Sequence, residues 1–173
     1  MLRSVTTCFI QRLNTSYLLI LQDYPDVTFV LQVGLTDRSQ YIHRLGRTAR
    51  AGKDGKGGLL LADYEESHMM KELSDMPLQL VSVPRSPKAS AAASRAIQNV
   101  AENKTLKISA EQAYRAWLGY YNGHLRKIRW DKKRLVEMAN AWGNEVGLVE
   151  QPSLQKKTVG KMGLKGVPGI RIE

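Results

Sequence analysis

Three arginines recur at intervals of three residues in the most chemically informative stretch of the sequence. Arg44, Arg47 and Arg50 lie in the segment YIHRLGRTARAG, which covers residues 41–52. On a continuous helix they would share one face, and if the helix ended near Gly46 they would line a loop. In both cases permanently charged guanidinium groups converge, and their mutual repulsion favours a bound anion such as phosphate. The alternative is a solvated basic helix whose arginines pair with nearby aspartates.

A second basic cluster surrounds an expected helix start at Asp131. Basic residues in the first turn of a helix oppose its dipole, so an external anion would offset their cost. Such side chains contact RNA phosphates without reading the sequence, and an aromatic ring among them can stack on an unpaired base. The cluster is a candidate RNA-binding surface with six cations in nine residues, namely Arg126, Lys127, Arg129, Lys132, Lys133 and Arg134.

The aromatic residues near this cluster also have structural interpretations. Trp130 is expected to act as a hydrophobic staple against Leu135 rather than as a base platform. Tyr114, Trp117 and Tyr121 are expected to belong to a core because they recur at helical spacing. For the cations, the alternative is an ordinary solvated face. Six phosphate contacts on single-stranded RNA would give log K against log salt a slope of roughly −4.

The charge of the chain is unevenly distributed. The net charge is +10, with +2 in residues 1–22, −2 in residues 23–83 and +10 in residues 84–173. This excess suggests a polyanionic partner, either nucleic acid or anionic lipid. No apolar run approaches the roughly 18 residues of a membrane span. The single cysteine excludes a disulfide framework, and the histidine spacing gives no zinc-binding pattern and no metal site.

Strands and helices alternate in the first half of the sequence. A buried strand is expected over residues 27–33 and a second strand over residues 57–62. Helices are expected at about residues 38–45 and 63–75, the second with Asp63 as its N-cap. The apolar side of that second helix is expected to carry Met69, Met70 and Leu73. This alternation is typical of an α/β fold with a parallel sheet.

The second half of the sequence is predicted to be helical and basic. Residues 84–94 combine two prolines with small residues, which indicates a linker. Apolar residues then recur at helical spacing between residues 114 and 125. Further helices are expected from the N-cap Asp131 to about residue 142, and from about residue 153 to 162.

Two parts of the sequence resemble a known family. HRLGRTARAG, residues 43–52, resembles motif VI of the DEAD-box RNA helicases, with the pattern HRxGRxxR. DYPDV, which begins at Asp23, resembles the segment after motif V, and GLLL resembles the strand after motif VI. Residues 114–130, the helix over residues 134–142 and the sequence KMGL resemble the helical C-terminal extension of mitochondrial DEAD-box helicases. Those helicases act as RNA chaperones in intron splicing.

This resemblance covers about residues 23–172 and implies a domain organisation. Residues 23–83 would form part of the second RecA-like domain, which is an α/β domain. Residues 84–94 would be a linker, and residues 95–173 would be an all-α, basic RNA-binding extension. Residues 1–22 would be an unmatched segment.

The resemblance also implies roles for individual residues. Arg47 and Arg50 match the arginine fingers of the family, which reach the γ-phosphate of ATP. His43 matches the histidine that couples the ATP site to domain closure, and Asp23 matches the motif V aspartate that contacts the ribose. Residues 20–22, Ile-Leu-Gln, stand near where the family has Arg-Gly. The part of motif V that touches the RNA backbone is therefore absent.

The sequence lacks the motifs that hold ATP in this family. It contains neither G-x-x-x-x-G-K-[ST] nor an Asp-Glu-Ala-Asp run. The ATP and Mg²⁺ of the family would therefore depend on an N-terminal RecA-like domain as partner, and neither is expected to bind tightly to this chain alone. The two expected strands have few neighbours, so residues 23–83 are expected to be loosely packed unless the helical half covers them.

The first 22 residues bear on the location of the protein. Residues 1–22 contain Ser, Thr and two arginines but no acid, which is typical of a mitochondrial transit peptide and predicts the mitochondrial matrix. The alternative is a truncated or mis-started reading frame before Asp23. The favoured function is the C-terminal part of an ATP-dependent RNA helicase. Its alternatives are a non-enzymatic RNA-binding module and a peripheral protein at a membrane surface.

Overall fold

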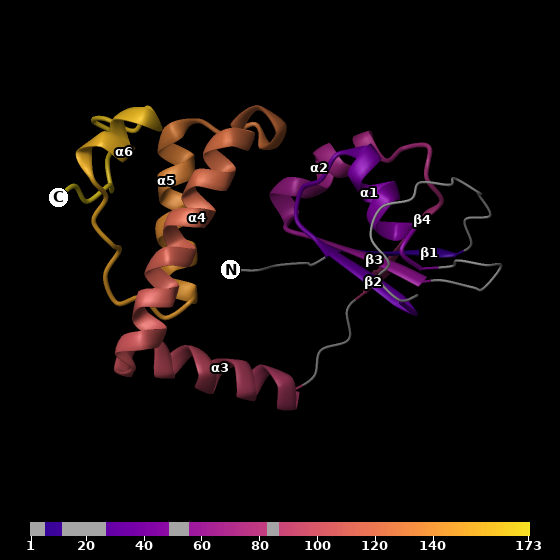
Figure 1. The fold of residues 1–173 in the computed structure, drawn as a ribbon, viewed down its shortest axis with the longest axis horizontal. Helices are drawn as coiled ribbons and strands as arrows, with labels where there is room; N and C mark the ends of the chain where they lie inside the picture. Colours follow the sequence, from indigo (N-terminus) through magenta and orange to yellow (C-terminus); the bar gives the residue numbers. More distant parts are fainter. Residues whose placement is uncertain (1–5, 12–26, 49–55, 83–86) are drawn as a thin grey trace. The chain divides into compact units, whose positions relative to one another are not determined.

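The computed structural model describes residues 6–11, 27–48, 56–82 and 87–173, and for residues 6–11 it describes only the backbone. The chain divides into two compact units, residues 1–84 and residues 85–173. Figure 1 shows the course of the chain in both units. Each unit is considered by itself below.

The first unit contains a four-stranded mixed sheet. The strands β1 (Thr6–Gln11), β2 (Phe29–Val33), β3 (Lys56–Leu61) and β4 (Leu78–Ser82) lie in the order β2-β3-β1-β4. β2 and β3 are parallel, which confirms the expected strand–helix–strand unit and the α/β class. β1 runs antiparallel to both β3 and β4. The sequence analysis predicted neither β1 nor β4.

Two helices lie on the same side of this sheet (Figure 1). α1 (Arg38–Leu45) begins where expected, because the side chain of Asp37 accepts a hydrogen bond of 2.8 Å from the backbone nitrogen of Gln40. α2 (Asp63–Glu72) also begins where expected, but its N-cap is Ala62 and not Asp63. Alanine has no polar side chain, so the carboxylate of Glu65 instead accepts a hydrogen bond from the nitrogen of Ala62, at 2.8 Å.

The core of the first unit lies between the helices and one face of the sheet. Its buried apolar side chains among the described residues are those of Leu35, Tyr41, Leu45, Leu59, Leu61, Met69 and Leu73. The backbone of Gly57 faces α1 so closely that a Cβ there would lie 2.2 Å from the Leu45 side chain. A larger residue at this position of β3 would therefore require the Leu45 side chain to move.

The opposite face of the sheet is exposed along β2. The side chains of Phe29, Leu31 and Val33 are 43%, 54% and 67% exposed. The expectation of a buried strand was therefore wrong about burial, since α1 and α2 cover only the face that carries the buried Gln32. Met70 was likewise wrongly placed on the apolar side of α2, because it is 40% exposed.

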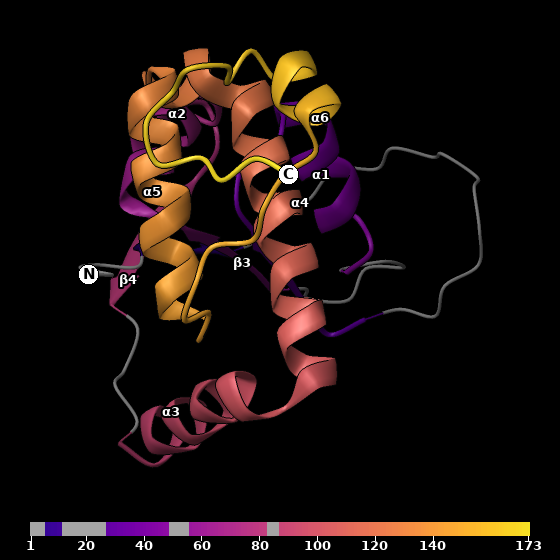
Figure 2. The ribbon, with the colours of Figure 1, turned by 90° about the vertical axis from the view of Figure 1, so that its left-hand side faces the viewer.

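The second unit is helical, as predicted. Figure 2 shows α4 (Lys104–Ile128) and α5 (Lys132–Glu145) side by side, with α3 (Pro87–Glu102) near one end and α6 (Lys156–Lys161) near the other. Residues 87–94, which the sequence analysis assigned to a linker, are helical and belong to α3. Proline is accommodated at the first position of a helix, and the alanines that follow it favour helix formation.

The helices of the second unit enclose a continuous apolar core. Asp131 is the N-cap of α5, as predicted, and its carboxylate accepts a hydrogen bond of 2.7 Å from the Arg134 nitrogen. The side chain of Asn140 joins three segments, because it accepts from the Tyr114 hydroxyl at 2.7 Å and donates to the Gly169 carbonyl at 3.0 Å. The core residues with no more than 2% exposure are Tyr114, Leu118, Leu135, Val136, Ala139, Val159 and Leu164.

Candidate functional site

The motif with three arginines spans the end of α1. The helix ends at Leu45, so Arg44 lies in its last turn and Arg47 lies in the turn that follows. This outcome selects the second of the two expected arrangements, in which the arginines do not share one continuous helical face. Arg50 and Asp23 both lie outside the described residues.

The side chain of Arg47 is oriented by His43. The Arg47 Nη2 atom lies 3.0 Å from the Nε2 atom of His43, which is one helical turn earlier. A guanidinium group can only donate hydrogen bonds, so Nε2 must accept and the imidazole in this arrangement is neutral with its hydrogen on Nδ1. His43 is exposed and Arg47 is half-buried. The pair therefore presents one oriented guanidinium group beside the helix end.

Backbone hydrogen bonds hold this turn in place. The Gly46 nitrogen donates to the Ile42 carbonyl at 2.8 Å, and the Thr48 nitrogen donates to the Leu45 carbonyl at 3.1 Å. The Arg47 carbonyl accepts from the Val27 nitrogen at 3.4 Å. The position of Arg47 is thus fixed by local capping and by the segment that enters β2. Arg44 instead donates to the Gln40 side chain, at 3.0 Å.

The second candidate site lies at the turn between α4 and α5. Arg126 and Lys127 are exposed in the last turn of α4, and Lys133 and Arg134 are exposed in the first turn of α5. Arg129 ends α4 in the left-handed conformation, with φ of 56°. Arg134 forms an exposed ion pair with Glu137 at 3.5 Å. We call the five exposed cations the turn cations, and they are Arg126, Lys127, Arg129, Lys133 and Arg134.

Lys132, the sixth predicted cation, has a structural environment instead. Its ammonium group donates to the side chain of Asn122 in α4 and to the carbonyl of Met162, the latter at 2.7 Å. Lys132 therefore connects the start of α5 to α4 and to the end of α6. Sequence reasoning missed this role because the two partners lie 10 and 30 residues away in the sequence.

The aromatic residues of this unit contact one another. The ring of Trp117 is stacked on that of Trp142 at a centroid distance of 5.9 Å, and it lies 6.4 Å from the ring of Trp130. Tyr114 and Tyr121 are buried, which confirms the expectation that they belong to a core. Trp117 and Trp130 are only half-buried. The expected staple between Trp130 and Leu135 remains a prediction, because the described ring contacts of Trp130 are with Trp117 and Tyr121.

The described residues contain neither a cluster of metal ligands nor a helix suited to cross a membrane. No group of three or more His, Cys, Asp or Glu side chains in this part of the chain could hold a metal ion. No helix in the described ranges is long and apolar enough to cross a membrane.

Comparison with known proteins shows which of them this chain is similar to. No family model matches the chain, and no solved structure matches it. DEAD-box ATP-dependent RNA helicase 31 of Arabidopsis thaliana, however, is 50% identical to it over 152 residues, which are 86% of this chain and 20% of the relative. The chain is a relative of the DEAD-box RNA helicases. Helicase 25 of the same plant is 46% identical over 158 residues, covering 87% of this chain and 26% of the relative.

One DEAD-box relative is described by its name as mitochondrial. It is an ATP-dependent RNA helicase of Phaeosphaeria nodorum, and it is 41% identical over 153 residues, covering 87% of this chain and 27% of the relative. In these three comparisons the chain spans between a fifth and about a quarter of the length of the DEAD-box helicase it matches.

The ATP named in these DEAD-box relatives can be tested against the described residues. Arg47 is a permanent cation with an orientation set by His43, which is the chemistry that a terminal phosphate requires. Among the described residues at the end of α1, the Arg47 guanidinium group is suited to contact a phosphate. These residues form no pocket for the base or the ribose. They therefore fit one part of an ATP site.

Proposed function

We propose that the chain acts as the C-terminal part of an ATP-dependent RNA helicase that serves as an RNA chaperone. The identity of 41–50% to DEAD-box RNA helicases over about 86% of the chain is the observation that carries this proposal. ATP and Mg²⁺, held mainly by an N-terminal RecA-like domain, would supply phosphoryl transfer. The resemblance to splicing chaperones and the mitochondrial relative favour a role in intron splicing in the mitochondrial matrix.

Arg47 and Arg50 are proposed to contact the terminal phosphate of that ATP. His43 would act as a positioning residue, because its Nε2 atom accepts a hydrogen bond from Arg47 and so limits the rotation of the guanidinium group. Asp23 would contact the ribose. The half-buried position of Arg47 supports this assignment, since a partly desolvated cation interacts more strongly with an anion.

The turn cations are proposed to bind RNA through its phosphates. They gather on one turn between two helices, and four of them have no acidic partner within ion-pair distance among the described residues. This arrangement supports binding that does not depend on sequence. Lys132 belongs to the same basic segment, but its bonds to Asn122 and Met162 favour a supporting role over direct contact with phosphate.

ATP hydrolysis tests the enzymatic part of this proposal. The whole chain should be inactive alone and should stimulate RNA-dependent hydrolysis when combined with the N-terminal RecA-like domain of a relative. Arg47→Ala should lower that rate by roughly 10³-fold or more, as for other arginine fingers. Lys71→Ala is a matched control, because Lys71 is an exposed cation on α2 outside the motif. Equal rates for the Arg47→Ala variant and the parent chain would reject the role of Arg47.

A non-enzymatic RNA-binding module is the second candidate function. The open face of the sheet at Phe29, Leu31 and Val33 favours it, because the helicase-like unit is covered less completely than the basic helical unit. RNA binding without any stimulated hydrolysis would select this alternative. Binding to anionic vesicles in preference to RNA would select a membrane-surface role instead.

A further inference from the structure

Further exposed lysines lie on and just after α6, which contacts the start of α5. Lys132 donates to the Met162 carbonyl, which places the end of α6 against the start of α5. Figures 1 and 2 both show α6 beside this end of the hairpin. No acidic group of the described residues lies within ion-pair distance of the lysines there. We call these four exposed cations the α6 lysines, and they are Lys156, Lys157, Lys161 and Lys165.

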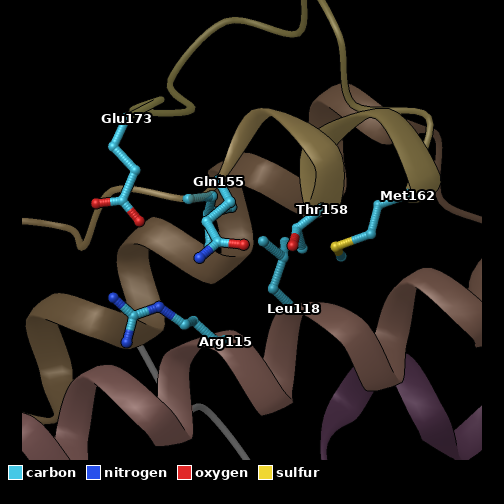
Figure 3. A pocket seen from close by; sticks show the side chains of 7 residues that line it. Arg115, Leu118, Gln155, Thr158, Met162 and Glu173 are labelled. Carbon is cyan, nitrogen blue, oxygen red and sulfur yellow. The ribbon is translucent and has the colours of Figure 1, made fainter.

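A pocket of about 330 Å³ opens beside α6 (Figure 3). Its apolar lining comes from Leu118 of α4, Leu154 and Met162. Leu118 and Leu154 are buried, and Met162 is half-buried. The apolar floor of the pocket therefore comes from α4 and from residues on either side of α6, the helix that carries three of the lysines, and Met162 is its most exposed member.

Polar side chains surround this floor. In Figure 3 the guanidinium group of Arg115 rises from α4 on the side of the carboxylate of Glu173, with the amide of Gln155 beside them and Thr158 close to Leu118. Arg115 donates to the Ser153 carbonyl at 3.4 Å and lies 3.7 Å from Glu111. The rim thus combines a planar cation with an amide, a hydroxyl and a carboxylate.

The carboxylate decides which part of an RNA strand suits the pocket. One oxygen of Glu173 accepts a hydrogen bond from the Ser153 hydroxyl at 3.1 Å. A carboxylate at the rim repels phosphate, whereas it attracts N–H donors on the edge of a base. Sites for small ligands typically combine apolar side chains with a few precisely placed polar groups. The pocket is therefore suited to a base, and the lysines beside it are suited to the backbone.

We propose that this pocket binds one unpaired guanine of an RNA strand held by the α6 lysines. Guanine presents two adjacent N–H donors on its Watson–Crick edge, which match a carboxylate, and its flat ring can rest on the apolar floor and stack against Arg115. The inference rests on the proposed RNA-binding function. It adds a preference for one base to a surface that otherwise contacts only phosphates.

Four short single strands test this inference with the whole chain. They are an oligouridine and three versions in which guanosine, inosine or adenosine replaces the central uridine. The strand with guanosine should bind about tenfold more tightly than the oligouridine and the adenosine strand. Inosine lacks the exocyclic amino group, so its strand should bind less tightly than the strand with guanosine.

Matched charge variants locate the effect. Glu173→Gln should remove the preference for guanosine, while Glu102→Gln, which makes the same charge change on the exposed surface of α3, should keep it. Lys161→Gln should weaken all four strands equally, because it removes a phosphate contact. Unchanged tryptophan fluorescence and melting temperature would show that each variant is folded.

The outcomes separate the two proposals. Equal affinities for the four strands with a retained salt dependence would overturn the guanine pocket and leave the RNA-binding function intact. Loss of guanosine preference in Glu102→Gln, or its persistence in Glu173→Gln, would also overturn the pocket. Failure of every strand to bind would contradict both proposals.

Discussion

The two units differ in how completely they cover their apolar surface. In the second unit the inward residues of α4 and α5, such as Leu118 and Leu135, have no exposure, and Leu164 closes the core from the C-terminal segment. In the first unit, Leu31 and Val33 point away from α1 and α2 and are more than half exposed. The basic helical unit therefore has the more complete core. The helicase-like unit retains an apolar face that further structure would stabilise.

Truncation of one leucine in each unit should give the largest contrast. Leu135→Ala should lower the free energy of unfolding of the second unit by about 2–5 kcal/mol, because it leaves a cavity in a closed core. Leu31→Ala should change the stability of the first unit by less than about 0.5 kcal/mol, because its side chain is already exposed.

Urea denaturation measures the free energy of unfolding of the two variants, and circular dichroism follows the unfolding of the whole chain. All three tryptophans, Trp117, Trp130 and Trp142, lie in the second unit, so their fluorescence reports that unit alone. A loss of more than 2 kcal/mol in the Leu31→Ala variant would show that the open face of the sheet is covered in solution.

Amide hydrogen exchange sharpens the comparison without any substitution. The amides of β2 should open at a free energy about 2 kcal/mol lower than those of residues 134–142 in α5, because fewer apolar contacts protect them. Mass spectrometry of peptides from the two segments gives both values in one experiment. Equal protection of the two segments would contradict the view that the first unit is loosely packed.

Removal of one hydroxyl tests the polar contact inside the second unit. Tyr114→Phe should cost about 1 kcal/mol, since it removes the 2.7 Å hydrogen bond to Asn140 while keeping the buried ring. Asn140→Ala, alone and combined with Tyr114→Phe, completes a double-mutant cycle for this hydrogen bond. An interaction free energy near zero in urea denaturation would indicate that the Tyr114–Asn140 bond contributes nothing specific.

Alkaline pH should also change the contribution of the same residue to stability. Burial raises the pKa of Tyr114 from 10.0 to about 12. The folded state then holds this proton more firmly than the unfolded state, so the contribution to stability is complete below pH 10 and is lost as the pH rises toward 12. The stability difference between the parent chain and Tyr114→Phe should therefore shrink over that range. A constant difference would contradict the raised pKa.

Local signals in the sequence predicted the elements better than their environments. Asp37 and Asp131 are capping residues at the expected helix starts, because capping depends on neighbours within three residues. Residues 27–33 form a largely apolar, β-branched run, which usually indicates a strand covered on both faces. The described helices of the unit cover only one face of that strand, and no local pattern distinguishes the two cases.

The candidate sites were predictable to different degrees. The spacing of His43 and Arg47 within one turn of helix made their contact foreseeable, and the structure brings them to 3.0 Å. The structural role of Lys132 depends on Met162, which lies 30 residues away, and the pocket beside α6 joins residues from Arg115 to Glu173. Such long-range contacts are set by tertiary packing, which the sequence pattern alone does not encode.

The salt dependence of RNA binding tests the central claim most directly, namely that the turn cations hold RNA through its phosphates. Five contacts of the turn cations to a single-stranded oligouridine should contribute about −3.5 to the slope of log K against log salt for the whole chain. Replacing Arg126, Lys127 and Lys133 with glutamine should make the slope about 2.1 units less steep. A slope near zero for the parent chain, or an unchanged slope in the triple variant, would contradict the claim.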